Sequence, residues 1–524
     1  MVTTVAMAHP VINQDKSIKL RYRDRCNPSL CLEVGLSLAL VCLPIVVQSA
    51  DWDGSASLAL SEIYSDNIRL SVADEESESI TTITPGISLK GQGARLKLDL
   101  SYSMQNLFYA QNPDRNRINH QLQASEQGEV IKDLFYFDSN ASISQQLTNP
   151  SEYFSQDNLN LSGQRDDVVT LQVEPYLKRT LGSYATAELR YLHGWVDYDA
   201  TGVSDAESSI VSAYLTNGNE PTKLSWYLSY RQQNDIRDTG PDSERRSSSA
   251  TISYRVMNTL SLVGYAGRED NNIQTSRASV NGSYWSAGFN WQPGPKFSLE
   301  ATTGENYDQV QLNWNPMTRT SVNIGYSDRD VGLNTSASWL AQISHRTRRS
   351  TWAFDYSEAV TNAQQLALID RTFLGNVENP DTGEIVPLFL DTYDITDGEF
   401  LRTRAQASVN YKTGKSNISL LAYNELRTYE VSGDELASEG GNISWRWQFA
   451  SRTSSTISVN GQRFDVFNSA DRRQNMTSRV SLARRLSSRM NTRVELSRYE
   501  VNTDNGSSET IVENRLGAYL NMSF

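Results

Sequence analysis

The C-terminal residues of this chain alternate between apolar and polar side chains with a period of two. Because successive side chains of an extended strand point to opposite faces, this alternation gives a strand with one apolar face and one polar face. The apolar face carries Val512, Leu516, Ala518, Leu520, Met522 and Phe524, and the polar face carries Glu513, Arg515, Gly517, Tyr519, Asn521 and Ser523. Such a strand suits a position between lipid and water.

The composition excludes one class of membrane protein and permits another. The mean hydropathy is −0.50 and only 38% of residues are hydrophobic, which excludes a bundle of apolar membrane-spanning helices. In a transmembrane β-barrel only alternate residues of each strand face lipid, so the mean hydropathy of a strand resembles that of a soluble protein. A barrel therefore fits both the composition and the C-terminal pattern.

Period-two segments of about ten residues recur along almost the whole chain after residue 50. They predict an all-β fold, a transmembrane antiparallel up-and-down β-barrel of 24 strands. Residues 296–303 and 309–314, which form either one bent strand or two, decide between 22 and 24 strands. Short links alternate with longer polar loops, so we expect an even strand count and both termini on the periplasmic side. Twenty-four strands enclose a ring about 45 to 50 Å across, too wide for inward side chains to fill.

The N-terminal segment reads as a secretory signal. An apolar run from Leu36 to Val47 follows five basic residues and precedes a small-residue site near Ala50. We therefore expect residues 1–50 to be a signal peptide and residues 51–524 to be the barrel. All three cysteines lie in the first part, so we expect no disulfide or thiolate metal site in the second. Residues 1–50 carry five basic and three acidic side chains, so the remainder carries −13 − 2 = −15, which argues against nucleic acid as a partner.

Residues 360–400 form the longest connection between predicted strands and carry eight acidic side chains with the apolar stretch IVPLFL. A loop of this length inside a compact fold is usually functional or disordered. Two interpretations stay open: a segment folded into the lumen as a constriction, and an extracellular surface loop.

Two parts of the chain resemble known proteins. The C-terminal strand with its aromatic last residue resembles the closing strand of bacterial outer-membrane barrels, and this likeness identifies Leu516, Ala518, Leu520, Met522 and Phe524 as an assembly signal read by the barrel-assembly machinery. The motifs SEIYSDNIRL (61–70), ITTITPGISLKGQGARLKLDLSYSMQNLFYA (80–110) and RNRINHQLQA (115–124) resemble the outer-membrane β-barrel family associated with the PEP-CTERM/exosortase system, which is linked to exopolysaccharide genes in Gram-negative bacteria. The resemblance implies localisation in the outer membrane and an envelope and polysaccharide context. It implies no reaction chemistry.

Parity places a mixed set of charges on the lumen face: Lys97, Asp99, Glu188, Arg190, Arg493, Glu495, Glu513 and Arg515. We interpret them first as structural pairs and second as a selectivity surface, because a channel for an anionic polymer favours one sign of charge. His120 and His193 raise the hypothesis of an outer-membrane hydrolase, yet neither lies in a nucleophile motif. We expect no catalytic site, no cofactor and no metal.

The leading hypothesis is therefore a non-enzymatic, porin-like outer-membrane barrel of an exopolysaccharide-linked system, acting as a channel or export-associated pore. Its expected partners are outer-membrane lipid, a polysaccharide, or a periplasmic protein or lipoprotein. The alternatives are a barrel that only anchors such a partner and an outer-membrane hydrolase. Conductance, co-purification of a lumen-blocking protein and activity loss on histidine replacement distinguish the three.

Overall fold

The computed structural model describes most of the chain after residue 50. It describes residues 51–147, 157–162, 165–199, 204–218, 223–238, 242–272, 281–332, 335, 337–362, 373–378, 385–389, 399–429, 432–466, 471–504 and 510–524. The predicted signal peptide, residues 1–50, lies outside these ranges. The chain has two compact units, residues 1–43 and 44–524, and the fold described below belongs to the second.

This part of the chain forms 26 strands and one short 3-10 helix, η2 (Pro113–Arg115). The strands are β1 (Asp51–Ser65), β2 (Glu78–Gln92), β3 (Leu96–Tyr109), β4 (Arg117–Ile131), β5 (Phe135–Leu147), β6 (Arg165–Leu181), β7 (Ala185–Tyr198), β8 (Ala206–Asn217), β9 (Leu224–Arg237), β10 (Ser243–Met257), β11 (Leu260–Asn271), β12 (Gly282–Gly294), β13 (Phe297–Glu305), β14 (Tyr307–Met317), β15 (Thr320–Arg329), β16 (Ser338–Arg346), β17 (Ser350–Asn362), β18 (Phe373–Glu378), β19 (Ile385–Phe389), β20 (Glu399–Lys412), β21 (Ser416–Tyr429), β22 (Glu435–Ala450), β23 (Thr453–Asp465), β24 (Arg472–Ser487), β25 (Met490–Asp504) and β26 (Thr510–Ser523).

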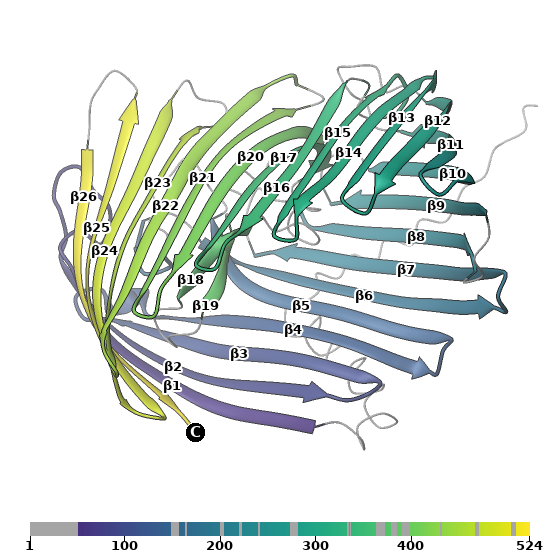
Figure 1. The fold of residues 1–524 in the computed structure, drawn as a ribbon. Helices are drawn as coiled ribbons and strands as arrows, with labels where there is room; N and C mark the ends of the chain where they lie inside the picture. The colour runs from purple at the N-terminus through teal and green to yellow at the C-terminus, as the bar shows by residue number, and fades with distance from the viewer. Residues whose placement is uncertain are drawn as a thin grey trace, which may run out of the picture. The chain divides into compact units, whose positions relative to one another are not determined.

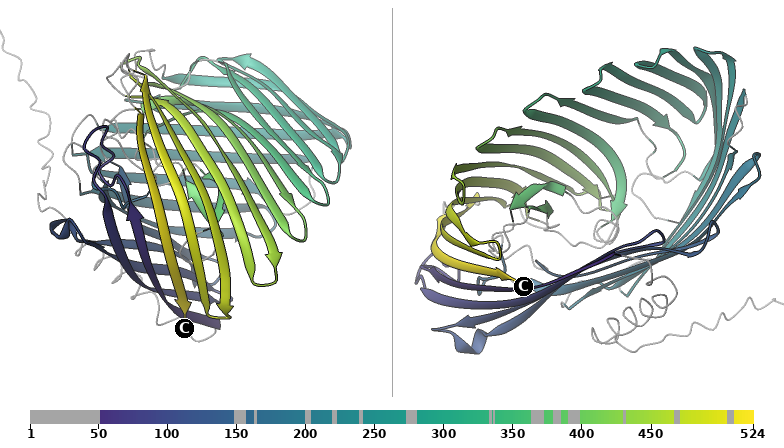
Figure 2. Two further views of the ribbon diagram at one scale, coloured as in Figure 1. Left: turned by 90° about the vertical axis from the view of Figure 1, so that its left-hand side faces the viewer. Right: turned by 60° about the horizontal axis from the view of Figure 1, so that its bottom comes forward.

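Twenty-four of these strands form one closed antiparallel sheet. Each strand pairs with its neighbours in sequence, β17 pairs with β20, and β26 pairs with β1, so the sheet has no free edge. Figures 1 and 2 show the resulting barrel. The prediction of a 24-stranded all-β barrel is confirmed.

The pair of segments that decided between 22 and 24 strands proves to be two strands. The pairing between β13 and β14 ends at Thr302 opposite Gln309, so residues 303–308 form the reversal. Within it, Asn306 adopts a left-handed backbone conformation with φ of 63°, which asparagine tolerates better than most residues. The structure therefore excludes the single bent strand.

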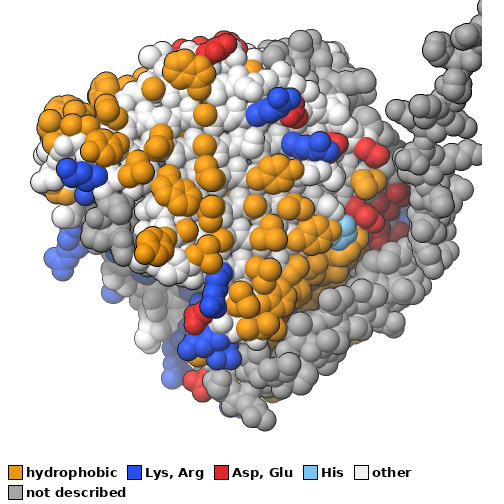
Figure 3. Space-filling model, turned by 90° about the vertical axis from the view of Figure 1, so that its right-hand side faces the viewer, with side chains coloured by type: hydrophobic (Ala, Val, Ile, Leu, Met, Phe, Trp, Pro, Cys, Tyr) orange, Lys and Arg blue, Asp and Glu red, His pale blue; other side chains and the backbone are white. Residues whose placement is uncertain are grey.

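The cross-strand register separates an inner face from an outer face around the whole barrel, because directly paired residues lie on the same side of a sheet. On the outer face many large apolar side chains are exposed, among them Ile87, Leu262, Val494 and Leu516. Figure 3 shows hydrophobic side chains spread over one part of this surface. A closed barrel with an apolar exterior satisfies every strand hydrogen bond inside lipid, so this is a protein of the bacterial outer membrane.

Exposed tryptophans mark one end of the barrel, where the connections are short. Trp291, Trp314 and Trp352 are half exposed near these turns, and Trp445 and Trp447 stack with ring centroids 6.2 Å apart. Aromatic residues gather at the membrane–water interfaces of such barrels. We call this end the short-turn end and the opposite end the loop end.

Glycines permit a sharp bend of the wall at β12 and β13. A Cβ atom on Gly288 would lie 1.8 Å from the carbonyl oxygen of Ala301, and one on Gly304 would lie 2.0 Å from that of Trp285. Only glycine lets the two backbones approach so closely. The bend brings the inner faces of β9–β11 toward those of β15–β17.

The long connection between β17 and β20 contains the hairpin of β18 and β19, which pairs with no barrel strand. The remaining residues between 363 and 398 lie outside the described ranges, so the role of the predicted loop, residues 360–400, as a constriction stays a prediction. Among the described residues, no helix has the length and apolar character to cross a membrane.

Candidate functional site: the inner wall at the barrel seam

The seam is the pairing of the first strand with the last. Its register runs from Ser57 opposite Ser523 to Ser65 opposite Arg515. Beyond it, the Phe524 amide donates to the carbonyl oxygen of Ala56 at 2.8 Å. The residues of the predicted assembly signal, Leu516, Ala518, Leu520 and Met522, share the outer face of β26, and Phe524 is exposed at its end.

The connection between β1 and β2, residues 66–77, folds against the inner wall instead of standing clear of the barrel. Ile68 packs with Ile63 and Ile80, and Leu70 packs with Val501 and other inner-face residues of β25 and β26. Ile68 is fully buried, and Leu70 is 2% exposed. Two small apolar clusters therefore lie on the inner wall, one on each side of the seam.

A second segment, residues 157–162 between β5 and β6, reaches the same place. Leu159 joins the cluster of Ile63 and Ile80, and its carbonyl oxygen accepts a hydrogen bond from Tyr109 at 2.9 Å. The backbone amide of Leu161 donates to the carbonyl oxygen of Ile68 at 3.1 Å. Backbone and apolar contacts thus fasten the two inward segments to each other.

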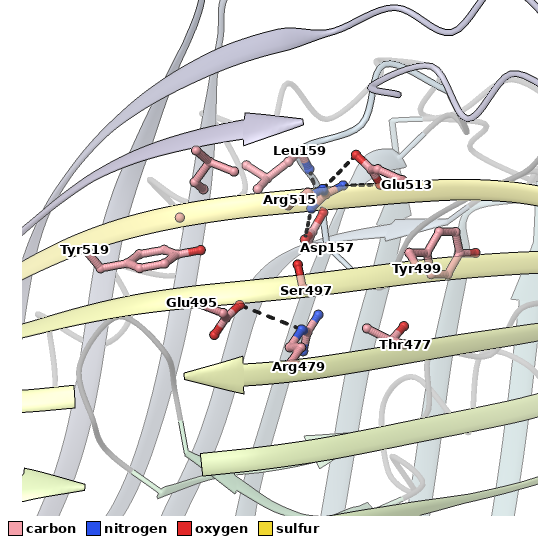
Figure 4. A pocket seen from close by; sticks show the side chains of 12 residues that line it. Asp157, Leu159, Thr477, Arg479, Glu495, Ser497, Tyr499, Glu513, Arg515 and Tyr519 are labelled. Atoms are coloured by element: carbon pink, nitrogen blue, oxygen red, sulfur yellow. Dashed lines mark hydrogen bonds and ion pairs between the residues drawn. The ribbon is translucent and has the colours of Figure 1, made fainter. Parts of the chain in front are cut away.

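Glu513 organises the polar contacts beneath these segments (Figure 4). Its carboxylate is fully buried and accepts from the Ser65 hydroxyl at 2.5 Å, from the Asn160 amide at 3.2 Å and from Arg515 Nε at 2.7 Å. Arg515 in turn donates to the Asp157 carboxylate and to the Asn160 side-chain oxygen, both at 2.5 Å. One carboxylate thus joins β1, β26 and the 157–162 segment.

A cavity of about 30 Å³ lies under this network, bordered by Arg479, Glu495, Tyr499 and Tyr519 among others (Figure 4). A void of this size holds a water molecule or two and excludes a sugar ring. The seam is therefore a closed, internally fastened part of the wall, with no room for a substrate.

At the loop end, the side chain of Glu76 links the β1–β2 connection to the β3–β4 connection. Its carboxylate accepts hydrogen bonds from the Asn112 amide, at 2.6 Å, and from Arg69. These hydrogen bonds, that of Asn112 first, hold the pKa of the Glu76 carboxyl below its usual range. The link is thus strongest when Glu76 is ionised.

The structure places all eight charged residues of the predicted lumen set on the inner face and brings most of them together in pairs. Arg190 bonds to Glu188, Arg493 Nη1 lies 3.2 Å from Glu495, and Arg515 bonds to Glu513. Asp99 pairs instead with Lys90 at 3.6 Å, across to β2. Among the described residues, Lys97 has no such ion pair.

The inner face of β20–β26 carries a large excess of basic side chains. By register it holds ten basic residues and three acidic ones, a surplus of seven positive charges. The basic residues are Arg402, Arg404, Lys412, Arg427, Arg446, Arg473, Arg479, Arg485, Arg493 and Arg515, and the acidic residues are Glu425, Glu495 and Glu513. On the inner face of β1–β17 the two signs are nearly equal in number. We call the residues of β20–β26 the basic wall.

The densest part of the basic wall surrounds Glu425. This buried carboxylate accepts from Arg402 at 3.0 Å, Arg404 at 2.6 Å and Arg427 at 2.8 Å. Three guanidinium groups thus share one carboxylate. Phe400 packs beside them, with the Arg427 guanidinium 5.2 Å from its ring centroid.

All three histidines outside the predicted signal peptide lie on the outer face, each beside a hydroxyl group. His193 Nδ1 is 2.7 Å from the Ser209 hydroxyl, His120 Nδ1 is 2.8 Å from that of Tyr102, and His345 Nδ1 is 2.8 Å from that of Thr320. Only the first pairs histidine with a serine. The recurrence of the contact with tyrosine and threonine indicates hydrogen-bond satisfaction of polar groups on a lipid-facing surface.

Several residues of the seam carry no signal in the sequence that would identify them. Asp157, Leu159 and Asn160 lie in a polar loop without any motif. The distinctive motifs did carry a signal, because Ser65 and Asn67 belong to SEIYSDNIRL and contact Glu513 and the carbonyl oxygen of Val512. Among the residues that the structure describes, no group of three or more acidic, histidine or cysteine side chains is placed to hold a metal ion.

Comparison with known proteins gives a fold likeness alone. No protein-family model matches the chain, and no curated protein does. The chain is similar in fold to the ferric enterobactin receptor PfeA of Pseudomonas aeruginosa, with 9% identity and a TM-score of 0.46, covering 91% of this chain and 82% of that one. It is also similar to the siderophore receptor PirA of Pseudomonas aeruginosa (10% identity, TM-score 0.41, covering 90% and 80%) and to a loop-deletion mutant of OmpT of Vibrio cholerae (8%, 0.32, covering 91% and 100%).

Proposed function

We propose that this barrel is a non-enzymatic channel of an exopolysaccharide-linked envelope system and that it passes anionic saccharide chains. The observation that carries the proposal is the basic wall, because its seven surplus positive charges line a lumen in a chain whose net charge is −13. A wall of one sign raises the local concentration of ions of the opposite sign. The resemblance of residues 61–124 to the exosortase-associated family supports the polysaccharide context.

The size of the barrel supports a passage for a polymer. Twenty-four strands enclose a ring about 45 to 50 Å across. The inward segments 66–77 and 157–162, which we call the seam clamp, lie beside β1–β3 and β24–β26. Between the arginines the basic wall presents serine, asparagine and glutamine side chains. Such groups form short-lived hydrogen bonds with sugar hydroxyls, which suits movement along the wall.

Ion selectivity tests the proposal directly. Residues 51–524, reconstituted in a planar bilayer under a KCl gradient, are expected to conduct and to give an anion-selective reversal potential. Arg446→Glu, at a partly buried position of the basic wall away from the seam, is expected to shift this potential toward the cation value. Lys97→Glu, on the inner face of β1–β17 where the two signs are nearly equal in number, is expected to change it less. A sealed bilayer would reject the channel, and cation selectivity of the unaltered barrel would reject its anionic substrate.

The long loop provides a second test of the channel. If residues 363–398 constrict the lumen, their deletion raises the single-channel conductance by a measurable factor. An unchanged conductance would reject the constriction and leave the selectivity result to decide the function. Co-purification of a lumen-blocking protein with a non-conducting barrel would favour the docking alternative.

A further inference from the structure

The sharp bend of the wall at β12 and β13 creates a cavity between two inner faces. Its volume is about 340 Å³, at the lower end of the range for small-ligand sites. One side is lined by β9–β11 and the other by β15–β17 with the connection that follows β15. This cavity, the corner pocket, lies away from both the seam and the basic wall.

Three arginines from separate strands converge on the corner pocket. Arg231 comes from β9, Arg245 from β10 and Arg329 from β15. Among the described lining residues, Glu269 is the only acidic one on the inner face, and its carboxylate lies 3.9 Å from Arg329 Nη1, a long contact. Basic side chains therefore outnumber acidic ones among these lining residues, and the hydroxyl groups of Ser247 and Ser327 border the same space.

A further acidic residue borders the pocket without altering this charge. Glu358 lies on the outer face by register, where its carboxylate accepts hydrogen bonds from the Tyr356 hydroxyl and, at 3.3 Å, from the backbone amide of Trp339. Its negative charge is thus directed to the other side of the wall.

Aromatic rings hold one of the three arginines in place. The Arg329 guanidinium carbon lies 4.7 Å from the ring centroid of Tyr307 and 5.2 Å from that of Tyr284. Both rings are buried and pack with Val331. A guanidinium fixed against aromatic faces loses less side-chain entropy when it binds an anion, which is the arrangement expected of a binding site.

We infer that the corner pocket binds a carboxylate-bearing sugar unit. The planar guanidinium group matches a carboxylate by two parallel hydrogen bonds, and serine hydroxyls beside it suit the ring hydroxyls of a sugar. The size of the pocket matches one or two sugar rings. This inference rests on the proposed function, because it names the chemical class of the chain that the channel passes, yet binding can be measured without conductance.

The test uses trigalacturonate as the carboxylated probe and maltotriose as its neutral counterpart. Titration calorimetry of the detergent-solubilised barrel is expected to show binding of trigalacturonate and no binding of maltotriose. Arg231→Gln removes an exposed guanidinium and is expected to weaken binding about ten- to a hundredfold, the range for a lost hydrogen bond to a charged group. Arg329→Gln is a second variant, and Arg255→Gln, on the inner face of β10 near the short-turn end, is the matched control, with unchanged affinity.

Three results would overturn the inference. The first two are equal binding of the two probes and unchanged affinity for trigalacturonate in both folded pocket variants. The third is displacement of trigalacturonate by inorganic phosphate at phosphate concentrations below the dissociation constant of trigalacturonate. Heat-modifiable mobility on gels verifies folding of each variant. Binding in a barrel that conducts nothing would reject the proposed channel and retain the pocket. Conductance without trigalacturonate binding would reject the pocket as a binding site and retain the proposed channel.

Discussion

Replacement of Glu513 by glutamine tests whether the seam depends on one buried carboxylate. Glu513→Gln keeps the volume of the side chain and removes its charge, so Arg515 retains only Asp157 as a carboxylate partner among the described residues. Removing one member of a buried ion pair costs about 3–5 kcal/mol, because the other charge stays buried. We expect about 3 kcal/mol, the lower end of that range, since Asp157 still neutralises part of the charge on Arg515.

The assay is urea unfolding of the barrel folded in lipid vesicles, followed by tryptophan fluorescence and extrapolated to water. Asp99→Asn is the matched control, because Asp99 also lies on the inner face but its pair with Lys90 is more than half exposed on both sides. An exposed pair contributes about 0–1 kcal/mol. Equal losses for the two variants, or a loss below about 1 kcal/mol for Glu513→Gln, would refute the view that the Glu513 network fastens the seam.

Two further predictions concern the bend and the loop end. Gly304→Ala is expected to destabilise the barrel by about 1–3 kcal/mol because its new methyl group meets a neighbouring carbonyl oxygen. Gly461→Ala, with open space around the new methyl group, is expected to be neutral. Urea unfolding measures the stability of both variants. Glu76 has a pKa below its unfolded value, owing to the hydrogen bonds from Asn112 and Arg69, so its stabilising effect is present above the unfolded pKa and is lost as the pH falls through the folded pKa. The stability difference between the unaltered barrel and Glu76→Gln is therefore expected to shrink between pH 7 and pH 3, and a constant difference would contradict the link.

The alternation of side chains was sufficient to predict the barrel, with 24 strands expected and 22 as the alternative. A period of two is imposed by the pleat itself, so inner and outer faces can be assigned wherever a strand is recognised, as for Lys97 and Asp99. The reversal at residues 303–308 could not be settled in this way, because one bent strand and two short strands give the same local pattern. The cross-strand register decided it.

The arrangement inside the lumen could not be predicted from alternation. Asp157 and Asn160 bind Arg515 and Glu513 across more than 350 positions of sequence, and nothing in a polar loop specifies where it folds back. The bend at Gly288 depends on how closely two backbones approach, which a lone glycine in a strand does not reveal. The ion pairs of the lumen could be predicted only in part, because Asp99 pairs with Lys90 on the neighbouring strand β2 and not with Lys97 on its own strand.

The distribution of charge within the wall narrows the path that a polymer would take through the proposed channel. The inward segments 66–77 and 157–162 cover the inner face near the seam, where Glu513 and Asp157 neutralise Arg515. The basic side chains of the wall lie farther round the ring, most densely at Glu425 and its three arginines on β20 and β21. Under the proposed function, an anionic chain would be attracted to the part of the wall that the seam clamp leaves open. The clamp would then have two effects: it would fasten the first strand to the last, and it would direct the substrate away from that junction.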